Sequence, residues 1–212
     1  MLPAKSTKTM SAGEKAQQVM ALDQKKLIKI LKSSKSTDFA RAKACQRLAV
    51  IGTAEAVPAL SAMLSDPKIA HYARFGLEPI PDASVDEALR RALGQLEGRL
   101  LAGVINSIGQ RRDPKAVGAL ATLMDDPHAE VAAAAAAALG RIGTPESAKE
   151  LEKALDYTKK VAGACLDCAD RLLSQGGKEP AIALYEALLR RGDLPEALRT
   201  GAKRGQEAAQ SR

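Results

Sequence analysis

The sequence of residues 126–146 reads DPHAEVAAAAAAALGRIGTPE and predicts the end of one helix and the start of the next. Its alanine-rich run continues to Ile142, where Gly143 offers the tight exit that favours a helix end. Thr144 carries a side-chain oxygen that can cap a new helix. Pro145 then takes the first helical position, where proline loses no hydrogen bond. The stretch therefore predicts two helices joined by a short turn.

The same pattern recurs along the chain. Five segments carry an apolar helix end, a turn and then a helix that closes on a leucine: residues 51–60, 80–89, 108–120, 142–151 and 173–184. The closing leucines are 29 to 33 residues apart. We expect helix caps at Thr53, Asp82, Asp113 and Thr144, and helix exits at Gly52, Gly109 and Gly143. A unit this short cannot bury its apolar face alone, so consecutive units must stack.

Residues 126–146 strongly resemble the HEAT-like repeats named after phycobilisome lyases, and the resemblance covers roughly residues 38–208. It implies an all-α fold, namely a right-handed α-solenoid of about five HEAT-like helical hairpins with an N-terminal capping helix. Residues 71–81 and 101–109 look like a narrower group of bacterial HEAT-repeat proteins of planctomycete and related lineages. Some of that group resemble helical partner domains of proteins acting on carbohydrates.

The composition excludes several functional classes. The chain has 212 residues, of which 46% are apolar and 2% aromatic, with no Trp. That apolar fraction is not typical of a disordered chain, and five aromatic residues cannot furnish the stacking platforms of single-strand binders. No apolar run approaches the ~20 residues that a membrane helix needs. We attribute the scarcity of aromatic residues to thin, alanine-packed layers that leave no room for large rings.

The charge is concentrated at the N-terminus. Residues 1–36 hold eight Lys against two acidic residues and so carry a net charge of +6. Residues 37–212 hold 24 basic and 23 acidic residues, a net charge of +1, so the body lacks the basic stripe typical of duplex binders. We expect residues 1–11 to be flexible, residues 12–36 to form a Lys-rich capping helix, and residues 37–212 to form the solenoid, in one domain with 12–36.

No catalytic or metal-ligating constellation is predicted, and no cofactor. Cys165 and Cys168 lack the further ligands that a zinc site requires, so we expect them, like Cys45, to pack as small apolar residues. Deoxyhypusine hydroxylase resembles the fold but needs paired His-Glu motifs for its irons. The two histidines here, His71 and His128, are followed by Tyr and Ala. The chain is therefore predicted not to be an enzyme.

Two groups of residues are candidates for binding. In related solenoids the alanine-rich helices line the concave surface, which makes His71, Arg74, Glu78, Asn106 and Arg141 the candidate concave-face residues. The alternative is that these side chains only form hydrogen bonds between repeats. Arg111 and Arg112 lie in the only insertion between repeats and are candidates for a contact loop.

The predicted function is a non-enzymatic protein-interaction scaffold, or a helical partner domain of a larger protein, that binds through the concave face. One alternative is a nucleic-acid binder that uses the Lys-rich N-terminus and the loop arginines. Another is an accessory domain that binds a ligand or accompanies a carbohydrate-acting enzyme. The expected partner is a protein or an adjacent catalytic domain. The chain shows no signal peptide and no membrane helix, and the resemblance allows either an exported mature protein or a cytoplasmic one.

Overall fold

The computed structural model describes residues 10–211, which form only helices and connecting turns. Within these residues there are 13 α-helices and three short 3-10 helices, and no strand. The all-α prediction is confirmed. Contacts group the chain into two compact units, Met1–Val85 (unit 1) and Asp86–Arg212 (unit 2), with the division inside α6 (Ala83–Leu93). The single domain predicted from the sequence stays a prediction.

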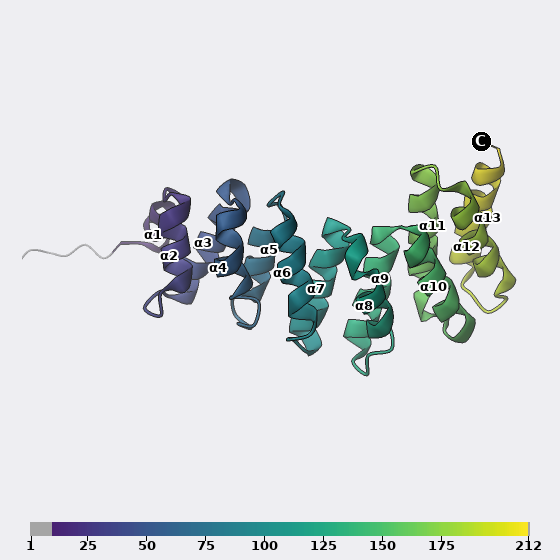
Figure 1. Cartoon of the computed structure of the whole chain (residues 1–212), viewed down its shortest axis with the longest axis horizontal. Coiled ribbons are helices and arrows are strands. Elements are labelled where there is room, and N and C mark those ends of the chain that lie inside the picture. Colours follow the sequence, from purple (N-terminus) through teal and green to yellow (C-terminus); the bar gives the residue numbers. More distant parts are fainter. Residues whose placement is uncertain (1–9, 212) are drawn as a thin grey trace, which may run out of the picture. The chain divides into compact units, whose positions relative to one another are not determined.

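Unit 1 has two layers of helices (Figure 1). Helices α1, α3 and α5 contact one another in sequence order in one layer, whereas α2 and α4 contact each other in the second. Their bounds are α1 (Ala12–Met20), α2 (Gln24–Lys32), α3 (Asp38–Ile51), α4 (Val57–Ser61) and α5 (Ala70–Leu77). The core between the layers consists of side chains at most 1% exposed, including Leu27, Leu31, Cys45, Leu48, Leu60 and Leu77.

Unit 2 repeats the two-layer arrangement. Helices α7, α9, α11 and α13 contact one another in turn in one layer, and α8, α10 and α12 do so in the other. Their bounds are α7 (Gly98–Arg111), α8 (Val117–Leu123), α9 (Ala129–Ile142), α10 (Pro145–Tyr157), α11 (Ala162–Ser174), α12 (Lys178–Arg190) and α13 (Glu196–Gln210). Ile105, Ile108, Leu120, Leu139, Leu151 and Leu184 are fully buried between the layers.

The five repeated segments of the sequence correspond to five consecutive helix pairs: α3 with α4, α5 with α6, α7 with α8, α9 with α10 and α11 with α12. Helix α13 extends the first layer of unit 2 and buries Ala202 and Ala209. The repeat count is therefore confirmed, whereas α13 lies beyond the last repeated segment.

The predicted capping helix is two helices. A single helix over residues 12–36 is wrong because the Asp23 carboxylate accepts a hydrogen bond from the backbone N–H of Lys26 at 2.9 Å and so begins α2. Helix α1, which starts at a Ser11–Glu14 capping box, has no fully buried residue. Most of the segment expected to be flexible, residues 1–11, lies outside the described residues.

The predicted caps hold at three of four positions. Asp82, Asp113 and Thr144 accept backbone hydrogen bonds from Ser84, Lys115 and Ser147 respectively. The cap predicted at Thr53 is wrong because its hydroxyl instead accepts a hydrogen bond from Gln24 Nε2 at 2.9 Å.

The predicted helix exits were only partly right. Gly143 ends α9 in the left-handed region with φ of 63°, as expected, and Gly52 ends α3 with an extended backbone. The exit predicted at Gly109 is wrong because α7 continues to Arg111, and Arg112 takes the left-handed conformation with φ of 59°.

The small residues of unit 2 allow close helix packing, as the alanine-rich run predicts. A Cβ placed on Gly109 would lie 2.8 Å from Ala138 Cα, and one placed on Gly140 would lie 2.8 Å from the Ala164 carbonyl oxygen. Both distances are too short for a side chain. Helix α9 therefore packs backbone to backbone on α7 at Gly109 and on α11 at Gly140.

Candidate functional site

The outer side of α3 and α5 in unit 1 exposes large apolar side chains. Phe39 is 41% exposed, Val50 73% and Phe75 51%. Phe39, Lys43, Gln46 and Val50 recur on α3 at intervals of four, three and four residues, which places them on one face of the helix. We call this surface the aromatic face and define it by Phe39, Lys43 and Val50 of α3 together with Lys68, Tyr72 and Phe75 of α5 and the turn before it.

A groove of about 300 Å³ runs between α3 and α5 on the aromatic face. Its apolar lining comes from Phe39, Ala42, Ile69 and Tyr72, and its basic lining from Lys43 and Lys68. The Lys43 ammonium lies 5.9 Å from the centroid of the Phe39 ring and donates to Gln46 Oε1 at 2.9 Å. Lys68 Nζ lies 3.2 Å from an Asp38 carboxylate oxygen in an exposed ion pair. The groove is therefore apolar at its base and charged along its edges.

Three of the predicted concave-face residues lie on or just after α5. His71 is exposed, and its ring meets the Tyr72 ring edge-on with the centroids 5.6 Å apart. Burial lowers the pKa of the half-buried Arg74 guanidinium, and the nearby Glu78 carboxylate acts in the opposite direction. Arg74 and Glu78 thus interact with each other, as residues four apart on a helix do.

The other two predicted concave-face residues meet in unit 2. Arg141 of α9 donates from Nη1 to Asn106 Oδ1 of α7 at 3.3 Å, although the two residues are 35 positions apart. Burial and the neighbouring Asp170 raise the pKa of the Asp167 carboxyl on α11, whereas Arg141 lowers it. Polar side chains from three successive helices of one layer therefore interact at its surface.

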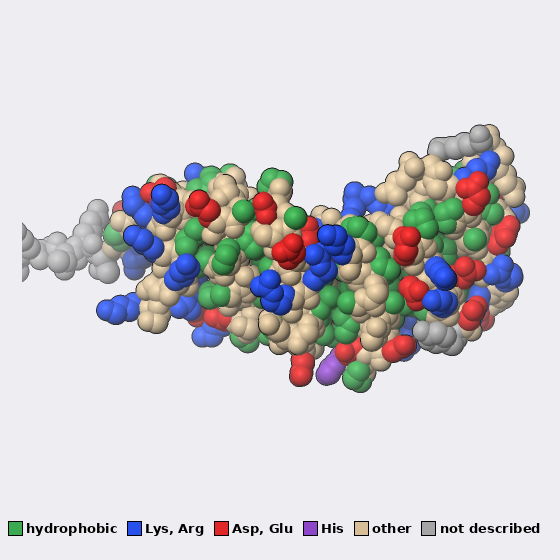
Figure 2. Space-filling model, viewed as in Figure 1, with side chains coloured by type: hydrophobic (Ala, Val, Ile, Leu, Met, Phe, Trp, Pro, Cys, Tyr) green, Lys and Arg blue, Asp and Glu red, His purple; other side chains and the backbone are tan. Residues whose placement is uncertain are grey.

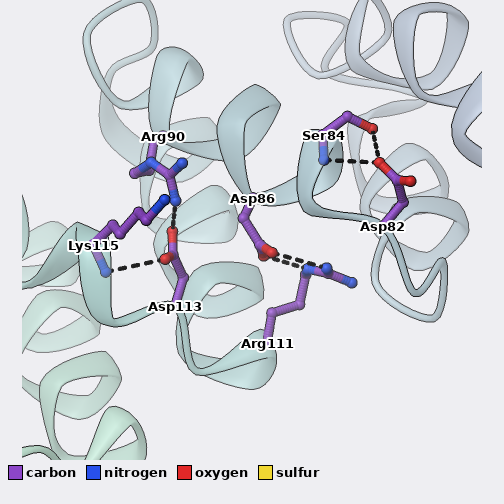
Figure 3. Close-up of polar contacts among 7 residues, drawn as sticks. All are labelled: Asp82, Ser84, Asp86, Arg90, Arg111, Asp113 and Lys115. Atoms are coloured by element: carbon purple, nitrogen blue, oxygen red, sulfur yellow. Dashed lines mark hydrogen bonds and ion pairs between the residues drawn. The ribbon is translucent and has the colours of Figure 1, made fainter.

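The insertion residues do not form a free loop. Arg111 is the last residue of α7, and its guanidinium binds the Asp86 carboxylate of α6 through Nε at 2.5 Å and Nη2 at 3.0 Å (Figure 3). Asp113 forms a second ion pair with Arg90 of α6. These two pairs fasten α6 to the C-terminal end of α7 and the turn after it. Arg112 stays exposed, and its charge contributes to a lowered pKa of Arg171, after the larger effect of burial.

A second groove lies between α9 and the 3-10 helix η3 (Lys159–Val161) that precedes α11 in unit 2. Its volume is about 310 Å³, and four alanines of α9 form its base: Ala129, Ala132, Ala133 and Ala136. Met124, Asp125 and Asp126 line one side, and Lys160 and Val161 the other. We call it the alanine groove. It occupies the place in its layer that the groove between α3 and α5 occupies in unit 1.

Known proteins share this architecture. Residues 85–166 match the family model for HEAT repeats. The chain therefore has a HEAT-like repeat fold. Among solved structures, an engineered protein from a structural genomics consortium shares 20% identity, with a TM-score of 0.54, over 90% of this chain and 97% of that chain. At that identity the likeness shows the HEAT-like fold alone. A search of the curated proteins finds no match.

Human deoxyhypusine hydroxylase, solved in complex with glycerol, is another similar structure, with 19% identity and a TM-score of 0.44 over 95% of this chain and 81% of that chain. HEAT-repeat proteins are generally non-catalytic. The absence of catalytic activity in this chain stays a prediction. Within residues 10–211 no group of three or more His, Cys, Asp or Glu side chains is placed to hold a metal ion.

The cysteines of the HEAT-like layers are buried, as expected. Cys45, Cys165 and Cys168 are free thiols with no exposed area. Burial raises the pKa of each thiol to about 12, and the neighbouring Asp167 adds to the effect at Cys168. No helix among the described residues is long and apolar enough to cross a membrane.

Sequence reasoning missed the aromatic face of this HEAT-like protein. Phe39, Tyr72 and Phe75 are three of the five aromatic residues in the chain, and all lie within 37 positions of one another. The scarcity of aromatic residues suggested rings excluded from thin layers, but Phe39 and Phe75 lie at the surface. Their concentration in α3 and α5 was the available signal.

Proposed function

We propose that this HEAT-like repeat protein is a non-enzymatic protein-interaction scaffold, or the helical partner domain of a larger protein. Within each unit it binds through the predicted concave face, which is the exposed surface of α3 and α5 in unit 1 and of α7, α9 and α11 in unit 2. HEAT repeats are generally interaction scaffolds, which supports the broad function. The finer assignment to this face is our inference.

The observation that carries the proposal is the pair of grooves. Each unit has a groove of about 300 Å³, between α3 and α5 in unit 1 and between α9 and the turn that leads into α11 in unit 2. Both are at the lower end of the size range of ligand pockets, and they suit one or a few side chains of a partner better than a whole cofactor. The exposed candidates His71, Asn106 and Arg141 lie on helices of this face.

Site-specific photo-crosslinking tests this assignment. A benzophenone amino acid placed at His71 or at Asn106 should give discrete crosslinks to a partner in the cells that make the protein. The same group at the exposed Lys149 of α10, in the other layer of unit 2, serves as the control. Crosslinks confined to Lys149 would contradict the assigned surface, and the absence of crosslinks from every position would contradict a scaffold function.

The nucleic-acid alternative makes a separate prediction. Lys25, Lys26, Lys29, Lys32 and Lys35 are all exposed, and phosphate binding by such lysines would fall steeply with salt. The scaffold proposal predicts no retention of duplex DNA even at low salt. Salt-dependent retention that is lost when these lysines become Glu would favour the alternative.

A further inference from the structure

The aromatic face exposes more apolar surface than folding of unit 1 requires. Ile69, Ala73 and Leu77 of the same region are at most 1% exposed and already supply the core. Phe39 and Phe75 are nonetheless 41% and 51% exposed. Exposed apolar patches rimmed by polar groups mark sites where another molecule docks. Large aromatic side chains are also enriched among the residues that dominate protein interfaces.

We propose that the aromatic face is the docking surface for an acidic, amphipathic helical segment of a partner protein. Two apolar anchors of that segment fill the groove between α3 and α5 and cover Phe75, while its carboxylates meet Lys43 and Lys68. This inference rests on the proposed scaffold function and assigns its partner chemistry and its location.

The charge around the face selects an acidic occupant. Lys43 and Lys68 line the groove against a single carboxylate, Asp38. Residues 10–36, which include α1 and α2, hold six Lys and two acidic residues and add a longer-range positive charge, although α2 lies in the other layer of unit 1. Figure 2 shows the Lys and Arg side chains crowding this end of the described chain, whereas both signs are mixed over the C-terminal helices. Opposite charge accelerates encounter and disfavours like-charged partners.

The same charge argues against two other occupants. Residues 1–9 of this chain hold two Lys and no acidic residue, so their charge opposes binding beside Lys43 and Lys68. A second copy of the chain would also be repelled, because the formal net charge of each copy is +7.

The groove geometry selects a helix with spaced apolar anchors. The groove is bordered by two neighbouring helices of one layer, and amphipathic helices bind such grooves through anchors at i, i+3 or i+4 and i+7. Val50 lies three turns after Phe39 on α3, about 16 Å along the helix at 1.5 Å per residue. A partner helix of three to four turns therefore covers the whole face.

The experiment selects peptides on the full chain from a random display library of segments about 16 residues long, which span roughly 24 Å as a helix. The peptides that the selection enriches should carry a net negative charge and apolar residues at helical spacing. Their dissociation constants are then measured by fluorescence anisotropy. Binding should weaken as salt rises from about 50 mM to about 300 mM, because ions screen the lysines.

Two variants test the location. Phe39→Ser with Phe75→Ser should weaken binding by at least about tenfold, or 1.4 kcal/mol, through loss of apolar contact. Lys43→Glu with Lys68→Glu should weaken it mainly through slower association. The matched control, Lys25→Glu with Lys35→Glu, changes the net charge equally at exposed positions of α2 and the turn after it. It should retain most of the affinity. Circular dichroism and thermal unfolding verify that every variant folds.

The remaining outcomes separate this inference from the scaffold function. If selected peptides bind the aromatic-face variants as well as the original chain but lose affinity when Ala129 and Ala133 become Glu, the scaffold stands and the aromatic face is wrong. If no peptide is enriched over bare support, both are wrong. If the original chain dimerises in light scattering and the Phe variant does not, a second copy covers the face and the acidic partner is wrong.

Discussion

The aromatic face of unit 1 and the alanine groove of unit 2 occupy the same place in the same kind of helix layer, but they are built from opposite residue types. In unit 2, α9 offers Ala129, Ala132, Ala133 and Ala136 at the groove. In unit 1, α3 offers Phe39, Ala42, Lys43 and Gln46 at the equivalent place. The difference shows that the repeat architecture leaves its outer surface free to vary. The two grooves therefore share a position in the fold and differ in the side chains that line them.

The two units also differ in how their helices are held. In unit 2, Gly109 and Gly140 let backbones meet, and ion pairs from Asp86 and Asp113 fasten α6. Ion pairs of unit 1, at 3.2–4.0 Å, are longer than the pair of Arg111 with Asp86 at 2.5 Å, and most are more exposed, as at Lys68 and Asp38. Unit 1 has a comparable close contact, since a Cβ placed on Gly76 would lie 3.0 Å from the Cys45 carbonyl oxygen. The two units therefore differ mainly in the burial of their ion pairs.

The largest expected effect is at the partly buried ion pair of Asp113 with Arg90 in unit 2. Asp113→Ala should lower the free energy of unfolding by about 3 kcal/mol. It leaves Arg90 without its ion-pair partner, and it removes the helix-capping hydrogen bond that the Lys115 backbone N–H donates to Asp113. Urea unfolding measures the loss. Asp193→Ala removes the exposed carboxylate that pairs with Arg191 and should change stability little. Equal losses in the two variants would mean that the Asp113–Arg90 pair stabilises the protein no more than an exposed ion pair does.

Close packing predicts a smaller loss. Gly140→Ala should destabilise the protein by about 2 kcal/mol, because the new Cβ meets the Ala164 carbonyl and the helices must separate. In Gly118→Ala the added methyl meets nothing within 4 Å, so helix propensity should stabilise the protein by up to about 1 kcal/mol. Thermal unfolding compares the two. A neutral Gly140→Ala would show that backbone contact between α9 and α11 is not required.

The buried thiols predict a loss of stability at high pH. Each thiol has a folded pKa of about 12, so it keeps its proton in the folded chain at pH values where the unfolded chain releases it. Stability should therefore be unaffected below about pH 8.5 and fall above it, by at most about 1.4 kcal/mol per pH unit for each thiol.

Replacing thiols in each unit separates their contributions. Cys165→Ala with Cys168→Ala removes two thiols from unit 2, and Cys45→Ala removes one from unit 1. Urea unfolding at about pH 8 and pH 10 should show the shallower pH dependence in the double variant. A pH dependence unchanged by all three substitutions would mean that other groups cause it.

The smallest effect concerns the helix exits of unit 2. Arg112→Gly should stabilise the protein by about 1 kcal/mol, because glycine adopts the left-handed conformation without steric cost. Gly143→Ala is the reciprocal change and should destabilise it, since φ is also positive there and the Arg171 side chain fills the space. Differential scanning calorimetry resolves both shifts. A destabilised Arg112→Gly would indicate that the Arg112 side chain contributes more than its backbone strain costs.

Much of the fold could be predicted from the sequence because the backbone preferences of single residues mark the helix boundaries of each repeat. Thr144, Pro145 and Gly143 mark a helix boundary through their own backbone preferences, and the structure follows them. The helix exit predicted at Gly109 is wrong because a contact with a residue distant in the sequence, and not a local backbone preference, explains this glycine. It is a glycine because Ala138, 29 residues later, touches it, so α7 runs through it to Arg111.

The candidate site was less predictable for the same reason. Asn106 and Arg141 were chosen from their positions in the repeat, and the structure joins them by a hydrogen bond. Arg111 was chosen as an insertion residue, but its partner Asp86 belongs to a different helix, so the ion pair was invisible in the sequence. Phe39 and Phe75 were not singled out in the sequence, because their exposure depends on which helix face the neighbouring layer covers.

Hydrogen–deuterium exchange of the full chain with and without a selected acidic peptide tests the central claim most directly. The aromatic face predicts slower exchange within residues 38–51 and 68–79, with residues 129–142 unchanged, and no such protection in the Phe39→Ser, Phe75→Ser variant. Protection confined to residues 129–142, or protection that survives in that variant, would contradict the assignment of the docking surface to unit 1.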